Sequence, residues 1–161
     1  MLFRSWREGS EAKLVIVGRE GWTQLPEEQR RNIPQTMEKL RRHPELGKRL
    51  IWLSDISDQC LEQVYRASSC LLFASEAEGF GLPLIEAARH GKPIIARNIA
   101  VFREITRDHA HYFDGQTPKA LARAVQDWIA LNKEGKAPSP SGLAWNTWQQ
   151  NAEKLLELLD L

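Results

Sequence analysis

Residues 70–88 read Cys-Leu-Leu-Phe-Ala-Ser-Glu-Ala-Glu-Gly-Phe-Gly-Leu-Pro-Leu-Ile-Glu-Ala-Ala, and this stretch gives the strongest indication of the fold class. It joins a short apolar run, 70–73, to a segment, 83–90, whose apolar side chains recur three or four residues apart. The first pattern predicts a strand that is buried on both faces, and the second predicts an amphipathic helix. A strand, a glycine-containing loop and a helix in this order are typical of parallel α/β sheets.

The same alternation of patterns continues along the chain. Apolar runs that predict further strands occupy residues 14–17, 50–53, 93–96 and 111–113. Segments with helical spacing occupy residues 35–42, 58–67, 117–131 and 145–161, and a short turn is expected at 101–105. The strand runs are continuous rather than alternating, as in strands that return through helices. The sequence therefore predicts an α/β fold with a doubly wound, mainly parallel sheet and helices on both faces.

The length of 161 residues is enough to bury one core, and we expect a single domain over residues 1–161. Residues 133–142 are rich in Pro, Gly and Ser, which predicts a surface loop. The terminal helix expected at 145–161 carries an apolar stripe, which predicts packing on the sheet or on a neighbouring domain. The stripe consists of Trp148, Ala152, Leu155, Leu156 and Leu159.

The charge balance and the apolar stretches exclude several classes of protein. Lys and Arg number 22 and Asp and Glu 21, a net charge of +1 spread along the chain, so no nucleic-acid partner is expected. No apolar stretch reaches the roughly 20 residues that cross a bilayer, and the start lacks the apolar core of a signal peptide. Leu2, Phe3 and Trp6 have helical spacing without a preceding start signal, which indicates a fragment of a longer protein.

Cysteine and histidine give little support for a metal site. Cys60 and Cys70 fit neither a disulfide framework nor a zinc site, which favours a reducing cytoplasm. His109 and His111 could bind a metal if a third ligand converged, although a structural role is the simpler interpretation. We therefore expect a cytoplasmic protein in which these histidines have structural roles.

The loop between the strand at 70–73 and the next helix carries the predicted chemistry. Ligands of open parallel sheets bind beyond the carboxyl ends of the strands, where the first turn of the following helix offers unpaired backbone N–H groups. Gly79 and Gly81 allow close approach of the backbone to a ligand, and Pro83 at the first helical position has the φ of a helix start. Such donors suit a pyrophosphate, so the sequence predicts a phosphate site here.

Two carboxylates flank this loop, with seven residues between them. Glu86, one turn into the helix, would repel a diphosphate but can accept hydrogen bonds from the vicinal hydroxyls of a ribose. Glu78, ahead of the glycines, can reach the other side of the pyrophosphate, where positive charge develops as a glycosidic bond breaks. Glu78 is therefore the candidate catalytic residue and Glu86 the candidate ribose ligand.

Three alternatives to a phosphate site are less consistent with these residues. Glu78 and Glu86 alone could be ordinary surface groups near a helix start, but the glycines and proline between them favour a site. A glycosidase would also use two carboxylates, yet a glycine loop at a helix start favours phosphate. A dinucleotide oxidoreductase would need Gly-x-Gly-x-x-Gly after its first strand, where residues 18–21 offer Gly-Arg-Glu-Gly.

The residues around the loop resemble a known family. Glu78-Gly79-Phe80-Gly81-Leu82-Pro83, then Glu86-Ala87 and Gly91-Lys92-Pro93-Ile94-Ile95-Ala96, resemble the Glu-x7-Glu signature of family 4 retaining glycosyltransferases, which have the two-domain GT-B fold. The resemblance extends from Val17-Gly18 through residues 52–58 to residues 101–105 and the terminal helix. It covers nearly the whole chain and corresponds to the carboxy-terminal, donor-binding half, a Rossmann-like half of that fold.

The resemblance implies a transferase whose donor is a nucleotide-diphosphate sugar, with neither a metal nor another cofactor. It implies that Glu78 contacts the donor sugar and that the remaining site residues bind the rest of the donor. These donor-binding residues are Gly79, Phe80, Gly81, Leu82, Pro83, Glu86, Ile56 and Asp58. Among them, Ile56 and Asp58 flank the base, Glu86 contacts the ribose, and the backbone of residues 80–82 contacts the diphosphate.

Three short segments resemble the bacterial members that build surface polysaccharides, often from GDP-mannose: Gly21-Trp22, Ala96-Arg97 and Val101-Phe102-Arg103-Glu104. This resemblance implies transfer of a hexose, with mannose favoured, to a glycan or a lipid-linked acceptor. The full-length protein would then touch the inner face of the membrane peripherally. The alternative is a non-catalytic sugar-nucleotide-binding or interaction module.

The departures from the family pattern concern charge and the second domain. The phosphate-binding Arg and Lys of the family lie upstream of the strand at 14–17, before the first residue of this sequence. The amino-terminal acceptor domain of the family is also missing, so the chain alone is expected to bind nucleotide weakly and to transfer little. Arg97 and Arg103 follow the fourth predicted strand, where they could face phosphate or instead pair with Asp108 or Glu104.

Overall fold

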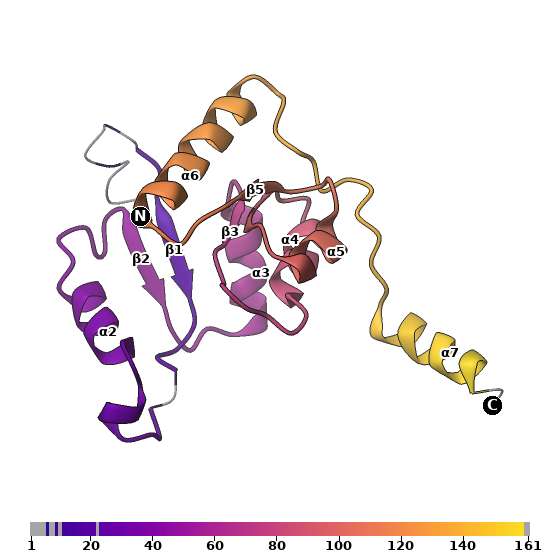
Figure 1. Cartoon of the computed structure of the whole chain (residues 1–161), viewed down its shortest axis with the longest axis horizontal. Coiled ribbons are helices and arrows are strands. Elements are labelled where there is room, and N and C mark those ends of the chain that lie inside the picture. Colours follow the sequence, from indigo (N-terminus) through magenta and orange to yellow (C-terminus); the bar gives the residue numbers. More distant parts are fainter. Residues whose placement is uncertain (1–5, 7–8, 10, 22, 160–161) are drawn as a thin grey trace. The chain divides into compact units, whose positions relative to one another are not determined.

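The structure, a computed structural model, describes residues 6, 9, 11–21 and 23–159 (Figure 1). The chain divides into two compact units, 1–67 and 68–161, and each is described here by itself. The predictions made for Leu2, Phe3 and Trp22 lie outside the described residues. Among the residues that are described, no helix is long and apolar enough to cross a membrane.

The first unit contains a two-stranded parallel sheet. Strand β1 (Leu14–Val17) pairs with strand β2 (Leu50–Leu53), with Leu14 opposite Leu50. The connection between these parallel strands contains the 3₁₀ helix η1 (Glu27–Gln29) and helix α2 (Ile33–Arg41), and helix α3 (Asp58–Ala67) follows β2. Parallel strands need such a crossover because the chain must return to the same end of the sheet.

The second unit contains a three-stranded parallel sheet in the order β3-β4-β5. Its strands are β3 (Leu71–Phe73), β4 (Ile94–Arg97) and β5 (His111–Phe113). Helix α4 (Leu82–Arg89) connects β3 to β4, and helix α5 (Ala100–Thr106) connects β4 to β5. Helix α6 (Pro118–Lys133) and helix α7 (Trp148–Leu158) complete the unit (Figure 1).

The core of the second unit forms around its middle strand. Ile94, Ile95 and Ala96 of β4 are fully buried, which explains why this run is continuously apolar. Each neighbouring helix contributes buried side chains: Leu84 and Ala87 of α4, Phe102 and Thr106 of α5, and Leu121, Ala122, Ala124, Val125 and Trp128 of α6. The buried hydroxyl of Thr106 donates to the carbonyl of Phe102 at 2.8 Å, so burial leaves this polar group satisfied.

The α/β fold with parallel strands and helices is confirmed, and the differences from the sequence predictions are local. The turn expected at 101–105 is a full helix, α5, and Pro83 occupies the second rather than the first helical position. No side chain is buried anywhere along the described helix α7, and within the stripe Trp148 is 82% exposed and Leu155 56%. Of the two predicted contacts for its stripe, packing on the sheet is therefore wrong, and packing on a neighbouring domain stays a prediction.

The segment between α6 and α7 contains no helix or strand over residues 136–147. It still contacts the folded unit, because Pro140 and Leu143 are buried and the carbonyl of Ser139 lies 2.9 Å from the ring nitrogen Nδ1 of His109. His109 thus has a structural partner. Across the described residues, no three His, Cys, Asp or Glu side chains are grouped to hold a metal ion.

Candidate functional site

The loop of residues 74–81 leaves the carboxyl end of β3 and leads into α4. Gly81 is the N-cap of α4 and has a φ of 85°, in the left-handed region that side chains with a Cβ rarely adopt. A Cβ at this position would lie 3.1 Å from Cδ1 of Leu84 and 3.3 Å from Cε1 of Phe102, both fully buried residues. The fold itself therefore requires glycine at position 81.

Gly79 has a different environment. Its φ lies outside the left-handed region, and among the described atoms a Cβ built on it would meet nothing within 4 Å. Neither backbone conformation nor packing within the chain explains a glycine here. A residue without a side chain leaves room for another molecule to approach the backbone.

The start of α4 offers a row of unused hydrogen-bond donors. Within the described part of the chain, no hydrogen bond uses the backbone N–H of Gly79, Phe80, Gly81 or Leu82. Pro83 has no N–H, and the N–H of Leu84 already donates to the carbonyl of Gly81 at 3.0 Å. The positive end of the helix dipole adds to these donors. Such a helix start is suited to an anion.

The two carboxylates differ in their surroundings. Glu78 is exposed, and its Oε1 accepts a hydrogen bond from the hydroxyl of Ser75 at 3.2 Å. Glu86 is half-buried and lies in the second turn of α4. Sequence reasoning missed Ser75, because no sequence pattern marks a hydrogen bond between two side chains of a loop. The structure thus places Glu78, the unused N–H groups and Glu86 on one continuous loop and helix.

Two large apolar side chains are exposed beside these backbone N–H groups. Phe80 is 54% exposed and Leu82 is 49% exposed, so both project from the loop although they are large and hydrophobic. Exposed apolar side chains beside unpaired N–H groups are typical of ligand sites, which combine apolar contact with a few polar groups.

Ile56 and Asp58, the predicted base-flanking residues, belong to the first unit. Both follow β2: Ile56 is half-buried in the loop, and Asp58 is the exposed first residue of α3. The loop of Glu78 belongs to the second unit. Their role at the base stays a prediction.

Arg97 and Arg103 form ion pairs with neither of the suggested acidic partners among the described residues. In the described structure neither forms an ion pair with Asp108 or Glu104. Arg97 donates to backbone carbonyls, and Arg103 donates from Nε to Oδ1 of Asn98 at 2.8 Å. The guanidinium of Arg103 also lies 3.7 Å from the ring centroid of Tyr112. Of the two alternatives for these arginines, the ion pairs are therefore not observed within the described ranges, and contact with phosphate stays a prediction.

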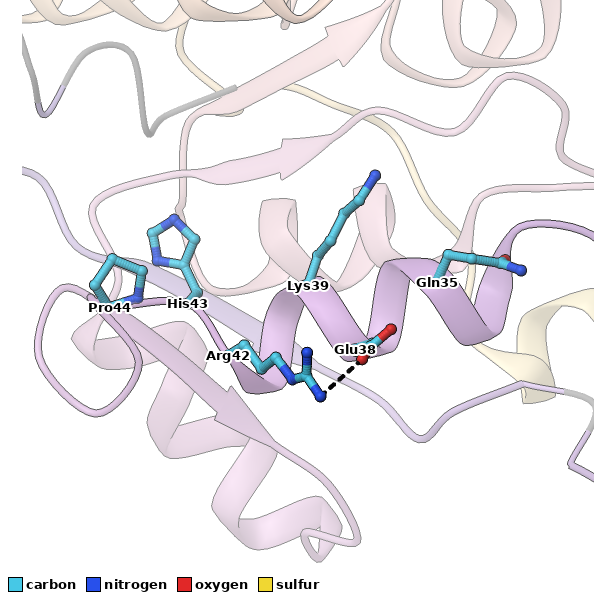
Figure 2. Close-up of a pocket in the computed structure, with 6 residues that line it drawn as sticks. All are labelled: Gln35, Glu38, Lys39, Arg42, His43 and Pro44. Atoms are coloured by element: carbon cyan, nitrogen blue, oxygen red, sulfur yellow. Dashed lines mark ion pairs between the residues drawn. The ribbon is translucent and has the colours of Figure 1, made fainter.

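A shallow hollow on the first unit lies along α2 and the turn that follows it (Figure 2). Gln35, Glu38, Lys39, Arg42, His43 and Pro44 line it, and Arg42 pairs with Glu38 at 3.0 Å. Every lining residue except His43 is exposed. These are ordinary surface side chains of an amphipathic helix, and they include no arrangement suited to catalysis.

The family of this chain follows from its comparison with known proteins. The family model described as glycosyl transferases group 1 matches residues 2–143, which is most of the chain. The chain belongs to this glycosyltransferase family, as the signature at residues 78–87 predicts.

Curated relatives include bacterial mannosyltransferases. The chain is 47% identical over 156 residues to the serotype-specific mannosyltransferase WbdA of Escherichia coli, a match that covers 97% of this chain and 18% of that protein. It is 31% identical over 83 residues to the O-antigen chain mannosyltransferase RfbU of Salmonella typhimurium, covering 52% of this chain and 24% of that one. The chain thus spans about a fifth of the length of these relatives.

Solved structures share the fold at low sequence identity. Sucrose-phosphate synthase from Thermosynechococcus elongatus matches with a TM-score of 0.71 at 24% identity, over 99% of this chain and 40% of that one. Alr3699/HepE of Anabaena, solved in complex with UDP-glucose, matches with a TM-score of 0.69 at 18% identity, over 99% and 44%. These neighbours are GT-B glycosyltransferases, so the expected fold is confirmed.

Proposed function

We propose that this chain is the donor-binding part of a retaining glycosyltransferase. In this proposal the whole enzyme moves a hexose from a nucleotide-diphosphate sugar to a glycan or a lipid-linked acceptor during surface polysaccharide biosynthesis. The observation that carries it is the row of unused N–H groups from Gly79 to Leu82, flanked by Glu78 and Glu86, in a chain of the group 1 family. The diphosphate of such a donor matches these N–H groups. The hydroxyls of its ribose match Glu86, and those of its sugar match Glu78.

Each part of the site then has a role. The backbone N–H groups of Gly79, Phe80, Gly81 and Leu82 hold the diphosphate, with Pro83 fixing the helix start. Glu86 accepts hydrogen bonds from the ribose hydroxyls. Glu78 faces the sugar, where its negative charge stabilises the positive charge that develops at the anomeric carbon. Ile56 and Asp58 flank the base.

The proposed transfer retains the anomeric configuration and uses no metal. The bond from the anomeric carbon to the diphosphate oxygen breaks, and a bond to the acceptor oxygen forms on the same face of the sugar. The departing phosphate oxygen takes the proton of the acceptor hydroxyl, so atoms and charges balance. The chain contributes binding, orientation and electrostatic stabilisation.

The favoured donor is GDP-mannose. Its support is the mannosyltransferase names of the relatives WbdA and RfbU, the first of which aligns with 97% of this chain. The Alr3699/HepE structure holds UDP-glucose, so the shared fold also accepts a different base and sugar in another protein. The acceptor would contact an amino-terminal domain that lies outside this sequence.

We place the protein in the cytoplasm, with peripheral contact of the whole enzyme at the inner face of the membrane. Cys60 and Cys70 are both free thiols in the structure, as is usual in a reducing compartment. The expected absence of a nucleic-acid partner rests on the net charge of +1.

One observation favours the alternative, a non-catalytic sugar-nucleotide-binding or interaction module. Residues 74–82 contain no Lys or Arg, so the loop itself supplies no cation to a departing diphosphate. A module that binds and does not transfer has less need of such a cation, because leaving-group charge develops only during transfer.

Calorimetric titration with GDP, UDP and ADP, each with and without an attached hexose, tests the proposal. We expect one nucleotide to bind selectively, and Glu86→Ala to abolish most of that binding. Glu104→Ala, which removes an exposed carboxylate of α5 in the same unit, is the matched control and should bind like the wild type. Absence of binding at millimolar nucleotide, or an equal loss in both variants, contradicts the proposed donor site. Transfer of radiolabelled mannose by the whole enzyme then separates an enzyme from a binding module.

A further inference from the structure

Arg97 connects the loops at the carboxyl edge of the β3-β4-β5 sheet. It is the last residue of the middle strand, β4. On one side, its Nε and Nη2 both donate to the carbonyl oxygen of Ala74, directly after β3, at 3.1 and 3.0 Å. On the other side, its Nη1 donates to the carbonyl oxygen of Gly115, in the loop after β5. One guanidinium therefore joins the loops that follow both outer strands.

In the part of the chain that is described, Arg97 forms hydrogen bonds to backbone carbonyls rather than an ion pair with a carboxylate. No ion pair with a carboxylate is found for it among the described side chains. Its guanidinium lies 5.1 Å from the ring centroid of Phe113, the residue opposite it in β5. The rigid planar fork of an arginine can donate in two directions at once, whereas the single ammonium of a lysine cannot reproduce this geometry.

The contact with Ala74 leads directly to the candidate catalytic carboxylate. Ala74 is followed by Ser75, and the hydroxyl of Ser75 donates to Oε1 of Glu78 at 3.2 Å. Fixing the carbonyl of Ala74 restricts the peptide plane that joins it to Ser75. The hydroxyl that holds Glu78 is thereby restricted as well.

Two other polar side chains at this edge, Asn98 and Arg103, do not connect to the loop after β3. Asn98 donates from Nδ2 to Oδ1 of Asp114 at 2.8 Å, and it accepts from Nε of Arg103 at 2.8 Å. The first bond joins the segment after β4 to the loop after β5, and the second joins that segment to α5. Neither Asn98 nor Arg103 bonds to the loop after β3, so the link from β4 to that loop falls to Arg97.

We propose that Arg97 is a positioning residue for Glu78: it holds the start of the loop at 74–81 so that Ser75 presents the Glu78 carboxylate to the donor sugar. The inference rests on the proposed function in assigning the sugar contact to Glu78. The positioning itself is a property of the unliganded chain, and it can be measured without any ligand.

The first test measures backbone order in the ligand-free chain. We expect the NMR order parameters of residues 75–78 to fall from about 0.85 in the wild type to about 0.6 or below in Arg97→Lys, the range of flexible backbone. Order parameters of β3 and α6 should not change. Arg123→Lys is the matched control, because Arg123 is exposed on α6 and pairs with Asp127 at 3.7 Å. Unchanged values at 75–78, or an equal fall throughout the second unit, would overturn the positioning role.

The second test is a double-mutant cycle with Glu78→Gln, read by calorimetry with GDP and GDP-mannose. We expect Arg97→Lys to weaken GDP-mannose about tenfold, within the usual range of coupled residues, and to leave GDP unchanged. In the Glu78→Gln background the same substitution should have no further effect on GDP-mannose. Equal weakening of GDP and GDP-mannose, or additive losses, overturns the inference. If the wild type binds neither nucleotide, the proposed function fails, and the order parameters alone decide whether Arg97 positions the loop.

Discussion

Replacing Gly81 by alanine should destabilise the second unit, because the fold demands glycine at this position. The left-handed conformation, with φ of 85°, costs an alanine about 1 to 2 kcal/mol. A Cβ 3.1 Å from Leu84 and 3.3 Å from Phe102 adds overpacking of about 1 to 3 kcal/mol, since both neighbours are fully buried. The reduced entropy of the unfolded chain offsets about 0.4 to 1 kcal/mol. The expected net loss is about 3 kcal/mol.

Urea unfolding measures this loss. At an unchanged slope, a loss of about 3 kcal/mol lowers the midpoint by about 1.5 M for a protein of this size. Gly79→Ala is the matched control, because its φ is ordinary and a Cβ there meets no described atom within 4 Å. We expect that variant to stay within about 0.5 kcal/mol of the wild type and to weaken nucleotide diphosphates instead. A Gly81→Ala chain as stable as Gly79→Ala would refute the reasoning.

Three further predictions concern the site and the thiols. Glu86→Ala should weaken a nucleotide and its sugar derivative alike by about 1 to 3 kcal/mol, whereas Glu78→Gln should weaken only the sugar derivative; equal calorimetric losses for both ligands in both variants would contradict these roles. Burial raises the pKa of the Cys70 thiol to about 11, so little of this thiol is thiolate at pH 8. A thiol reagent should therefore label the exposed Cys60 first, and equal labelling rates of the two thiols by mass spectrometry would contradict this. Excess EDTA should leave donor binding unchanged, and a loss restored by a divalent cation would show a metal requirement.

Sequence patterns predicted the strands well because burial on both faces leaves a continuous apolar run. The predicted runs at 14–17, 50–53 and 111–113 match β1, β2 and β5 without a shift. Helix α5 was expected only as a turn, since seven residues show barely two repeats of the helical period. Its buried Phe102 and Thr106 are recognisable as core only once the strands on either side are placed.

Two features could not be obtained from sequence patterns, for different physical reasons. The apolar stripe of α7 predicts which helix face is apolar but not what covers that face, and Trp148 and Leu155 of the stripe are exposed in the structure. Arg97 bonds to backbone carbonyls, which every residue carries, so no complementary side chain marks its partners in the sequence. Glu78 and Glu86 could be proposed from the sequence because glycines and a proline mark the loop between them, and their roles stay predictions.

The charge at the candidate site limits how tightly the loop alone can hold a donor. A helix start supplies about half a positive charge, whereas a nucleotide-diphosphate sugar carries about two negative charges. Glu78 and Glu86 flank the same loop, and residues 74–82 contain no Lys or Arg. The N–H groups can therefore orient a diphosphate but cannot neutralise it. Cations outside this loop must therefore supply most of the affinity. Because salt screens such charges, binding of the donor by the chain should weaken strongly as the salt concentration rises.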